Sequence, residues 1–381
     1  MKRKEYQEDL LKSGPFVLVG LCFLSFWGAT GCSTDIDLTA PYERTPVVFS
    51  LLEAEKDTQW VRINRTWLGD GNQFEAAMES DSSEYPASDL LVGLEERVGE
   101  QVMRSWSLQD TVISNKSEDG IFYGPDHQMW FFVPEGGLDS NAEYDLSVDI
   151  ADGTHAEAST NMVVTQAGNI TQPPPGVVNF KFGFANIGFQ TTYPDVTFKW
   201  SSTDGASQYD ISMRIHVTER IWADLAHTQL VDEVDRVIEW SMGTLRTDSD
   251  EGGEVLQKEV SGERFFSTLA TQLEEDEYVT RVLGYWDEDV QIARAFDFIL
   301  TIANDELSTY LEINSPVTGV IQERPEYTNI QGGLGLFASR ATQGVYGVGY
   351  TTSTIEHLME SETTALLNFC TPNPFSDFFC D

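Results

Sequence analysis

The sequence predicts a mainly β protein built from two β-sandwich domains. Apolar and polar residues alternate through many short segments, and this two-residue period is typical of half-buried strands. Turn-forming residues separate the segments. Three consecutive prolines and a glycine at 173–176 interrupt the series. Because proline stiffens a linker and cannot donate a hydrogen bond to a sheet, we expect one domain over residues 46–168, a linker over 169–176 and a second domain over 177–345.

Residues 1–31 have the layout of an export signal. Basic residues at positions 2–4 precede an apolar run over 16–27, which at about a dozen residues is shorter than the roughly 20 that a spanning helix needs. Small residues directly precede Cys32. This arrangement predicts cleavage after Gly31 and an acyl chain on the Cys32 sulfur. The alternative is an ordinary signal peptide with a chance cysteine.

Residues 32–45 are mostly polar and are expected to form a tether between the lipid and the folded part. They include Asp35 and Asp37, and acidic residues at this place resemble the surface-export signal of Bacteroidetes lipoproteins. The resemblance implies an outer-membrane protein that faces the cell surface, with the periplasmic face as the alternative. No other run of the sequence is apolar enough to cross a bilayer, so the mature protein is predicted to be held at the membrane by its lipid.

The chain is strongly acidic, with 62 Asp and Glu against 23 Lys and Arg among 381 residues and a formal net charge of −39. Such a charge repels nucleic acid and anionic lipid head groups, so neither is an expected partner. Two interpretations compete: a surface that binds cations or basic ligands, and adaptation to high salt, where an acidic shell stays hydrated and screened. Scarce lysine and scattered acidic residues favour the second.

The C-terminal tail, residues 346–381, contains Cys370 and Cys380. Cys22 leaves with the signal and Cys32 carries the lipid, so these two cysteines remain in the mature chain. An even pair in an oxidising compartment predicts a disulfide.

The first domain is predicted to be Ig-like. Its expected strands cover residues 46–52, 58–68, 90–95, 101–108, 129–133, 144–150 and 156–164. Tyr144, Leu146 and Val148 alternate after a glycine pair at 136–137. This pattern resembles the tyrosine corner of Ig-like sandwiches, where a tyrosine hydroxyl holds the chain that crosses between sheets. The alternative is another antiparallel β fold with an ordinary core tyrosine.

The second domain is predicted to be fibronectin type III-like with short helical insertions. A strand that ends at Trp200, a turn at Asp204 and Gly205, and a strand led by Tyr209 resemble the opening hairpin of such modules. This resemblance implies a fold and not a function. Further strands are expected at 177–184, 229–242, 278–284 and 293–301.

The helical insertions are expected at two places. Apolar residues at helical spacing predict a helix over 263–273, with Ser261 as its cap. Asn304 is expected to cap a shorter helix that ends at Leu311, since acidic residues occupy its first turn.

Three landmarks together resemble one protein family. They are the lipidated start with Asp37 and strands at 46–52 and 61–65, the helix at 304–311, and a glycine-rich motif. The residues of this motif are Asn329, Ile330, Gly332, Gly333, Leu334, Gly335 and Phe337. The layout looks like a family of Bacteroidetes outer-membrane lipoproteins with a domain of unknown function, whose members are often encoded beside TonB-dependent receptors. The resemblance implies an accessory role in substrate capture beside such a receptor.

The glycine cluster of this motif, Gly332, Gly333 and Gly335, raises the question of an anion-binding loop. The lysine and hydroxyl residue of a phosphate-binding loop do not follow it. We therefore expect a bulged strand at which another backbone approaches closely, which glycine permits.

Residues 248–259 match the spacing of an EF-hand-like calcium loop in part. The candidate ligands are Asp248, Asp250, Glu254 and Glu259, at positions that supply oxygen ligands in such loops. Gly252 stands where a further side-chain oxygen is expected, and the preceding segment is predicted as strand. In so acidic a chain the favoured interpretation is a solvated hairpin loop without a cofactor, with calcium as the alternative.

Catalytic signals are weak. The five histidines form no metal-binding pair at helical spacing, and no serine lies in a nucleophile-elbow pattern. Asp126 with His127, and Asp152 with His155, are candidate base dyads, although turn residues are the favoured interpretation. The sequence leaves enzymatic activity open and favours its absence.

Aromatic residues make up 12% of the chain and suggest a platform for sugar or peptide. The candidates are Trp222, Trp286, Phe375, Phe378 and Phe379. Three functions stay open: a non-enzymatic accessory partner of a TonB-dependent receptor in nutrient uptake, a surface hydrolase of peptides or glycans, and a structural or adhesive envelope protein. The ligand is not predicted.

Overall fold

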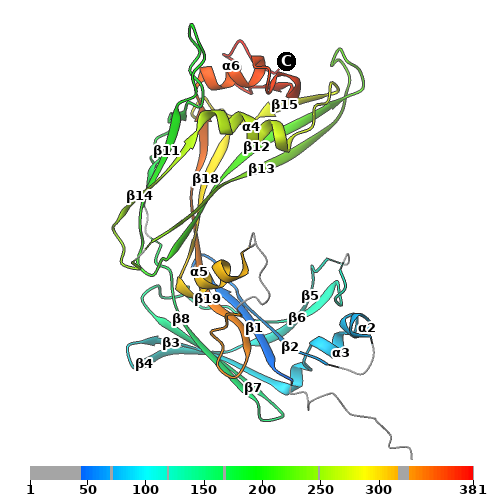
Figure 1. Ribbon diagram of the computed structural model, residues 1–381, viewed down its shortest axis with the longest axis vertical. Helices are drawn as coiled ribbons and strands as arrows, with labels where there is room; N and C mark the ends of the chain where they lie inside the picture. The colour runs from blue at the N-terminus through cyan, green and yellow to red at the C-terminus, as the bar shows by residue number, and fades with distance from the viewer. Residues whose placement is uncertain are drawn as a thin grey trace, which may run out of the picture. The chain divides into compact units, whose positions relative to one another are not determined.

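The computed structural model describes residues 44–68, 72–117, 120–165, 169–247, 249–315 and 326–380. Within them strand dominates over helix, and the strands form four sheets (Figure 1). The predicted mainly β class is confirmed.

The first part of the chain forms two sheets that share one apolar core. Its strands are β1 (Pro46–Leu52), β2 (Gln59–Arg65), β3 (Leu90–Val98), β4 (Gln101–Ser107), β5 (Gln109–Ser114), β6 (Asp126–Phe132), β7 (Glu143–Ile150) and β8 (His155–Asn161). One sheet has the order β4-β3-β7-β8, and β1, β2, β6 and β5 belong to the other. The shared core includes Val48, Ile63 and Trp130 from one sheet and Leu94, Tyr144 and Leu146 from the other. The short helices α2 (Gln73–Ala77), α3 (Ser80–Ser83) and η1 (Ala87–Asp89) lie between β2 and β3.

Strand predictions hold for most of this part, because each buried strand shows the two-residue period in its burial. β7, for example, alternates buried residues with partly or fully exposed ones along its whole length. β5 was not predicted: it pairs with β6, most of its residues are exposed, and it therefore carries no strong apolar pattern.

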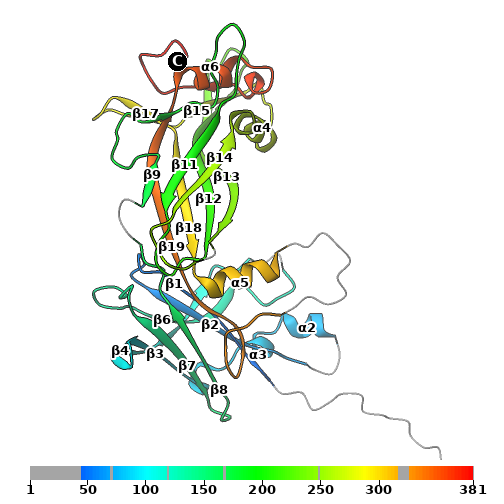
Figure 2. The same cartoon turned by 60° about the vertical axis from the view of Figure 1, so that its left-hand side comes forward.

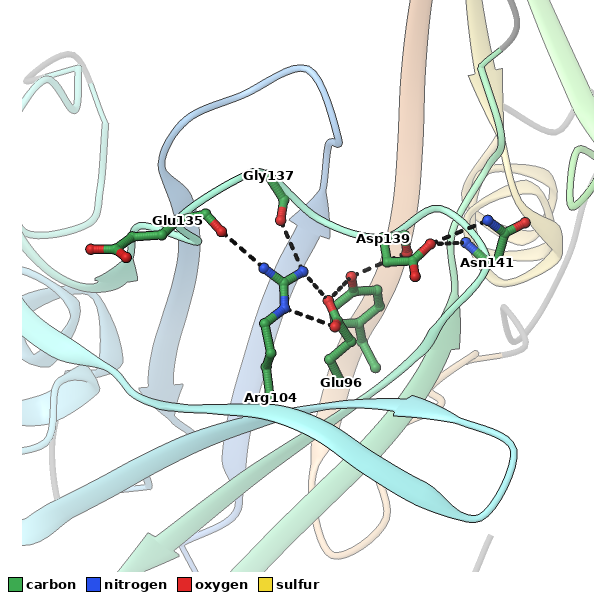
Figure 3. A network of polar contacts seen from close by, with 7 residues as sticks. Glu96, Arg104, Glu135, Gly137, Asp139 and Asn141 are labelled. Carbon is green, nitrogen blue, oxygen red and sulfur yellow. Dashed lines mark hydrogen bonds and ion pairs between the residues drawn. The ribbon is translucent and has the colours of Figure 1, made fainter.

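A polar network around the buried side chains of Glu96 and Tyr144 holds the chain between β6 and β7 in place (Figure 3). Arg104 donates to both carboxylate oxygens of Glu96, to the carbonyl of Glu135 at 3.0 Å and to that of Gly137 at 2.9 Å. The Tyr144 hydroxyl oxygen lies 2.7 Å from a Glu96 carboxylate oxygen and 3.2 Å from the Asp139 carbonyl oxygen, and it has a single proton to donate. The shorter distance and the charge favour Glu96 as the acceptor.

The same contacts set the acidity of the carboxyl group. Burial raises the pKa of Glu96, but the hydrogen bonds from Arg104 and Tyr144 outweigh it and hold the pKa below its usual 4.5. For Tyr144, burial and the neighbouring Glu96 carboxylate raise the pKa far above its usual 10.0.

We expect Tyr144→Phe to destabilise the protein by about 1.5–3 kcal/mol, because it removes a buried hydrogen bond to a charged group. A carboxyl group with a lowered folded-state pKa adds stability above its unfolded-state pKa of about 4.5, and this stability is lost as the pH falls through the folded value. The effect of the substitution should therefore shrink in acid. Urea denaturation between pH 3 and 7 measures this loss of unfolding free energy. A loss of equal size across that range contradicts the role of Glu96. Tyr346→Phe, at an exposed position, is the control.

The second part contains the longest strands of the described residues. Its strands are β9 (Ile170–Gln172), β10 (Lys181–Phe182), β11 (Asp195–Ser201), β12 (Gln208–Trp222), β13 (Leu230–Arg246), β14 (Val255–Ser261), β15 (Val279–Leu283), β16 (Tyr285–Asp287), β17 (Ile292–Arg294), β18 (Phe296–Ala303), β19 (Leu334–Tyr350) and β20 (Phe369–Cys370). Its helices are α4 (Gly262–Gln272), α5 (Asp305–Asn314), α6 (Thr352–Glu360) and η2 (Ala365–Leu367).

An aromatic core holds this second part together. Trp200 and Tyr209, singled out in the sequence, are fully buried with ring centroids 5.8 Å apart. Phe184 stacks on Phe265 of α4 at 4.2 Å, so this helix closes the core.

The two predicted helices are present, but one cap differs from expectation. Ser261 makes no side-chain capping hydrogen bond; it is also the last residue of β14. Asn304 caps α5 as expected, with its side-chain oxygen 3.2 Å from the Leu307 amide. Its amide nitrogen also donates to Thr160 at 2.8 Å, which ties α5 to β8. α6 was not predicted.

β19 joins both parts in one continuous sheet. It pairs antiparallel with β18, and its first half pairs parallel with β1, from Val47 opposite Leu334 to Leu52 opposite Ser339. Figures 1 and 2 show this orange strand beside β18 and beside β1. Ile330 and Phe337 are buried in the core of the first part. The predicted domain over 46–168 thus lacks a strand that comes from far along the chain.

The predicted linker is also shorter than expected. β9 lies within residues 169–176 and pairs with β11, so this stretch belongs to a three-stranded sheet of order β14-β11-β9. β9 ends at Gln172, directly before the three prolines, which cannot donate to a ladder.

Candidate ligand-binding site

The glycine-rich motif serves backbone packing. Asn329 accepts from the Phe337 amide at 2.9 Å and donates to its carbonyl at 2.6 Å, as a paired strand would. A Cβ at Gly332 would lie 2.2 Å from the His155 carbonyl, and one at Gly333 would lie 2.9 Å from the Pro46 carbonyl. At Gly335 the distance to the Val48 carbonyl would be 1.9 Å. The close backbone approach expected from the sequence is thus observed.

The candidate calcium loop is tied by hydrogen bonds to the turn at 202–205. The Gly252 amide donates to Asp204 at 2.8 Å, and the Glu254 amide donates to Ser202 at 2.9 Å. Glu259 lies within β14, whose extended backbone carries it away from the loop at roughly 3.3 Å per residue. Asp250 lines a separate surface cavity.

Asp248 lies outside the described residues. Among those that are described, no group of three or more His, Cys, Asp or Glu side chains is placed to hold a metal ion. Calcium binding at 248–259 stays a prediction.

His155 pairs differently from its candidate dyad with Asp152, and Asp126 accepts from Ser114 and makes no contact with His127 among the described hydrogen bonds. The His155 ring lies 2.8 Å from Asp149 and 3.4 Å from Glu157, and hydrogen bonds to these two carboxylates raise its pKa. Asp152 instead accepts from the Thr154 amide, as a turn residue does. Sequence reasoning missed the pair of His216 and Asp297 at 2.8 Å, because these residues meet only through the pairing of β12 with β18.

Cys32 and its preceding signal lie outside the described residues. No helix in the described part of the chain is long and apolar enough to span a membrane.

Two of the predicted platform aromatics come together at a cavity of about 150 Å³. Trp286 and Phe375 approach to 5.9 Å between ring centroids at an interplanar angle of 64°. The buried side of the cavity includes Tyr350, Leu283 and Ala295. The other candidates lie elsewhere: Trp222 donates to Thr280 and stacks on His227, while Phe378 and Phe379 do not line this cavity.

One wall of the cavity is the hairpin of β16 and β17. Gly284 starts it with φ +75°, and a Cβ there would lie 1.9 Å from the Arg294 carbonyl, so only glycine allows this turn. Across the hairpin Arg294 donates to Asp287 at 2.6 Å, which lowers the pKa of Asp287. Gln291 has φ +56°, a conformation uncommon for residues other than glycine. These constraints fix the hairpin that carries Trp286 and Gln291.

The opposite wall is the C-terminal loop, which is closed by the disulfide between Cys370 and Cys380. Within the loop Thr371 donates to the Phe378 carbonyl at 2.9 Å, and Cys380 donates to the Thr371 carbonyl at 3.0 Å. The Asn373 side chain accepts from the Phe375 amide at 3.0 Å. The backbone around Phe375 is therefore held in place, although the residue is largely exposed.

The lining combines aromatic rings with neutral polar groups. Gln291, Asn373, Ser376 and Thr352 contribute amides and hydroxyls, and among the described lining residues only Lys181 is charged. None of the described residues that line this cavity carries a carboxylate, whereas acidic residues line the larger cavities beside Glu55, around Glu95 and around Asp305. The described lining of this cavity thus differs in charge from the strongly acidic chain as a whole, whose net charge is −39.

The cavity beside Glu55 measures about 340 Å³. Burial, together with neighbouring Glu53, raises the pKa of Glu55, and a perturbed acid in a cavity is a possible catalytic group. Its described lining contains neither a second carboxylate nor a histidine. An acid–base pair for hydrolysis is thus not assembled from the described lining residues.

Comparison of the chain with models of known protein families finds no match, and comparison with curated proteins finds none either.

Proposed function

We propose that the protein is a lipid-anchored, surface-exposed outer-membrane lipoprotein that binds a ligand as a non-enzymatic partner of a TonB-dependent receptor. The observation that carries this proposal is Cys32, which directly follows small residues and a short apolar run. The acidic residues Asp35 and Asp37 and the glycine-rich motif support the surface location and the receptor partner through the family resemblance.

For the architecture we propose an Ig-like first domain and an elaborated fibronectin type III-like second domain. The Tyr144 hydroxyl oxygen lies 3.2 Å from the Asp139 carbonyl oxygen, although its proton goes to Glu96, and this close approach to upstream backbone resembles the tyrosine corner and supports the first assignment. The contact of Trp200 with Tyr209 in the core of the second part supports the fibronectin type III-like assignment. The helices α4 and α5 are insertions in this scheme.

The binding role draws on the cavity at Trp286 and Phe375. Exposed aromatic rings beside a few neutral polar groups, on walls that are fixed in advance, are typical of small-ligand sites. The position of this cavity on a hairpin and a closed loop suits a surface that meets ligand outside the cell.

Lipid anchoring is tested by metabolic labelling with a radioactive fatty acid. We expect label in the native protein and none in Cys32→Ala, which also loses sedimentation with outer membranes. Cys370→Ser is the control, because it removes a cysteine outside the signal and should keep the label. A native protein that carries no label, or a labelled Cys32→Ala, contradicts the anchor.

The partner is tested by gentle detergent extraction of outer membranes followed by affinity purification. We expect a TonB-dependent receptor to co-purify with the native protein. Extraction as a species without any receptor contradicts the partner while leaving the anchor intact.

The hydrolase alternative rests on Glu55. It predicts activity on a panel of peptides and glycans that Glu55→Gln abolishes. If deletion instead alters envelope integrity without a growth defect on any nutrient, the structural or adhesive alternative is favoured.

A further inference from the structure

We propose that the cavity between Trp286 and Phe375 binds one sugar ring of a glycan. This inference rests on the proposed binding role and names its ligand class.

The aromatic pair offers the apolar half of a sugar site. Phe375 is 77% exposed as a residue and its ring meets Trp286 edge to face, so most of its surface is left for another partner. Aromatic faces carry negative charge density. The C–H groups on one face of a sugar ring are weakly positive and apolar, and they pack on such a surface through dispersion and weak C–H contacts.

The polar rim offers the other half. The side chains of Gln291 and Lys181 make no hydrogen bond or ion pair with any described residue, and both lie at the cavity. An amide carries two donors and an acceptor, so Gln291 and Asn373 match hydroxyl groups, which both donate and accept. Thr352 and Ser376 add hydroxyls of their own.

The charge of the lining separates sugar from cationic ligands. A basic peptide is attracted to most of this acidic protein, but the described lining of the cavity offers no carboxylate to pair with it, and Lys181 repels it. Lys181 can donate to a sugar hydroxyl or to the carboxylate of a uronic acid. Neutral and acidic sugars are therefore both compatible, and Lys181 distinguishes them.

The size of the site limits how much of the ligand enters. About 150 Å³ is well below the roughly 300–1,000 Å³ of pockets that enclose drug-sized molecules. The cavity therefore accommodates a single ring, and the rest of a glycan remains outside. The constrained Gln291, the Asp287–Arg294 contact and the closed C-terminal loop fix both walls before binding, which lowers the entropic cost.

The test uses the purified full-length lipoprotein in detergent. It is screened against neutral oligosaccharides of glucose, mannose, galactose and xylose, against uronate oligosaccharides, and against tripeptides. Calorimetry then gives the Kd of each binder. We expect saturable binding of at least one oligosaccharide, weakened about tenfold or more in Phe375→Ala and in Trp286→Ala. Trp286→Phe should lose less than Trp286→Ala, because it keeps an aromatic face.

Phe189→Ala is the matched control: its ring is also exposed, it lies outside the cavity lining, and its loss should leave the Kd unchanged. Equal thermal melting of Phe375→Ala and the native protein separates binding from folding. Lys181→Gln then distinguishes the two classes of sugar. A loss of affinity for uronate oligosaccharides alone shows that the natural sugar is acidic, whereas an equal loss for neutral oligosaccharides shows that the natural sugar is neutral.

Three results overturn the proposal: no oligosaccharide binds, oligosaccharide binding survives both aromatic substitutions, or only tripeptides bind. None of them bears on fatty-acid labelling or on receptor co-purification, so the anchor and the partner stand or fall separately.

Discussion

Gly335→Ala is expected to destabilise the folded protein by about 3 kcal/mol or more. Gly335 lies opposite Val48 in the parallel pairing of β19 with β1, and its φ is +117°. A Cβ there would lie 1.9 Å from the Val48 carbonyl oxygen, so the two strands must separate. Backbone strain and overpacking each cost roughly 1–3 kcal/mol, and here they act together at the junction between the two parts of the chain. Urea denaturation measures the loss.

Gly153→Ala is the control for the conformational cost alone. Its φ is +93°, but no atom lies within 4 Å of the added Cβ, so a loss of only about 1–2 kcal/mol is expected. Equal losses at the two glycines would show that the close contact with Val48 contributes nothing.

Arg281→Met is expected to cost about 3 kcal/mol. The guanidinium is buried and donates to Glu219 at 2.9 Å, to the Leu367 carbonyl at 2.8 Å and to the Glu274 carbonyl at 2.9 Å. Methionine fills a similar volume but leaves both carbonyls without this donor, and Glu219 keeps only its contacts with Arg236. Breaking a buried charge pair costs about 3–5 kcal/mol; the remaining Arg236 places this case at the lower end.

The exposed pair of Arg214 and Glu239 provides the comparison. Its atoms are 3.8 Å apart on a solvated face, so Arg214→Met should change the free energy of unfolding by less than about 1 kcal/mol. If Arg281→Met lowers the free energy of unfolding by no more than Arg214→Met does, the buried guanidinium holds neither η2 nor the end of α4 in place.

These two positions explain how distant segments complete each part of the chain. Gly335 lets β19 join β1, and Arg281 holds the C-terminal segment that leads into β20 and the disulfide loop. Loss of either should also disturb the candidate sugar site, since β19 ends at Tyr350 beside the cavity and β20 starts its loop wall. Phe375→Ala is free of this coupling, because Phe375 is largely exposed.

Local patterns were sufficient for the parts of the fold that depend on local physics. The two-residue period of β7, β11 and β12 follows from one buried and one exposed face, and Asn304 caps α5 because its side chain reaches an amide three residues ahead. The glycine cluster at 332–335 predicted that another backbone segment approaches closely, but it did not indicate which segment.

The sequence by itself thus determined the mainly β class and most strand positions. Only the tertiary structure decided that β19 pairs with β1 nearly 300 residues away in the chain, since hydrogen bonds between strands carry no local sequence signal. It also decided which of the predicted aromatics meet: Trp286 and Phe375 share a cavity because β15 pairs with β20 and places the hairpin beside the disulfide loop. Composition supplied those rings, but their convergence depends on contacts between segments that only the folded chain brings together.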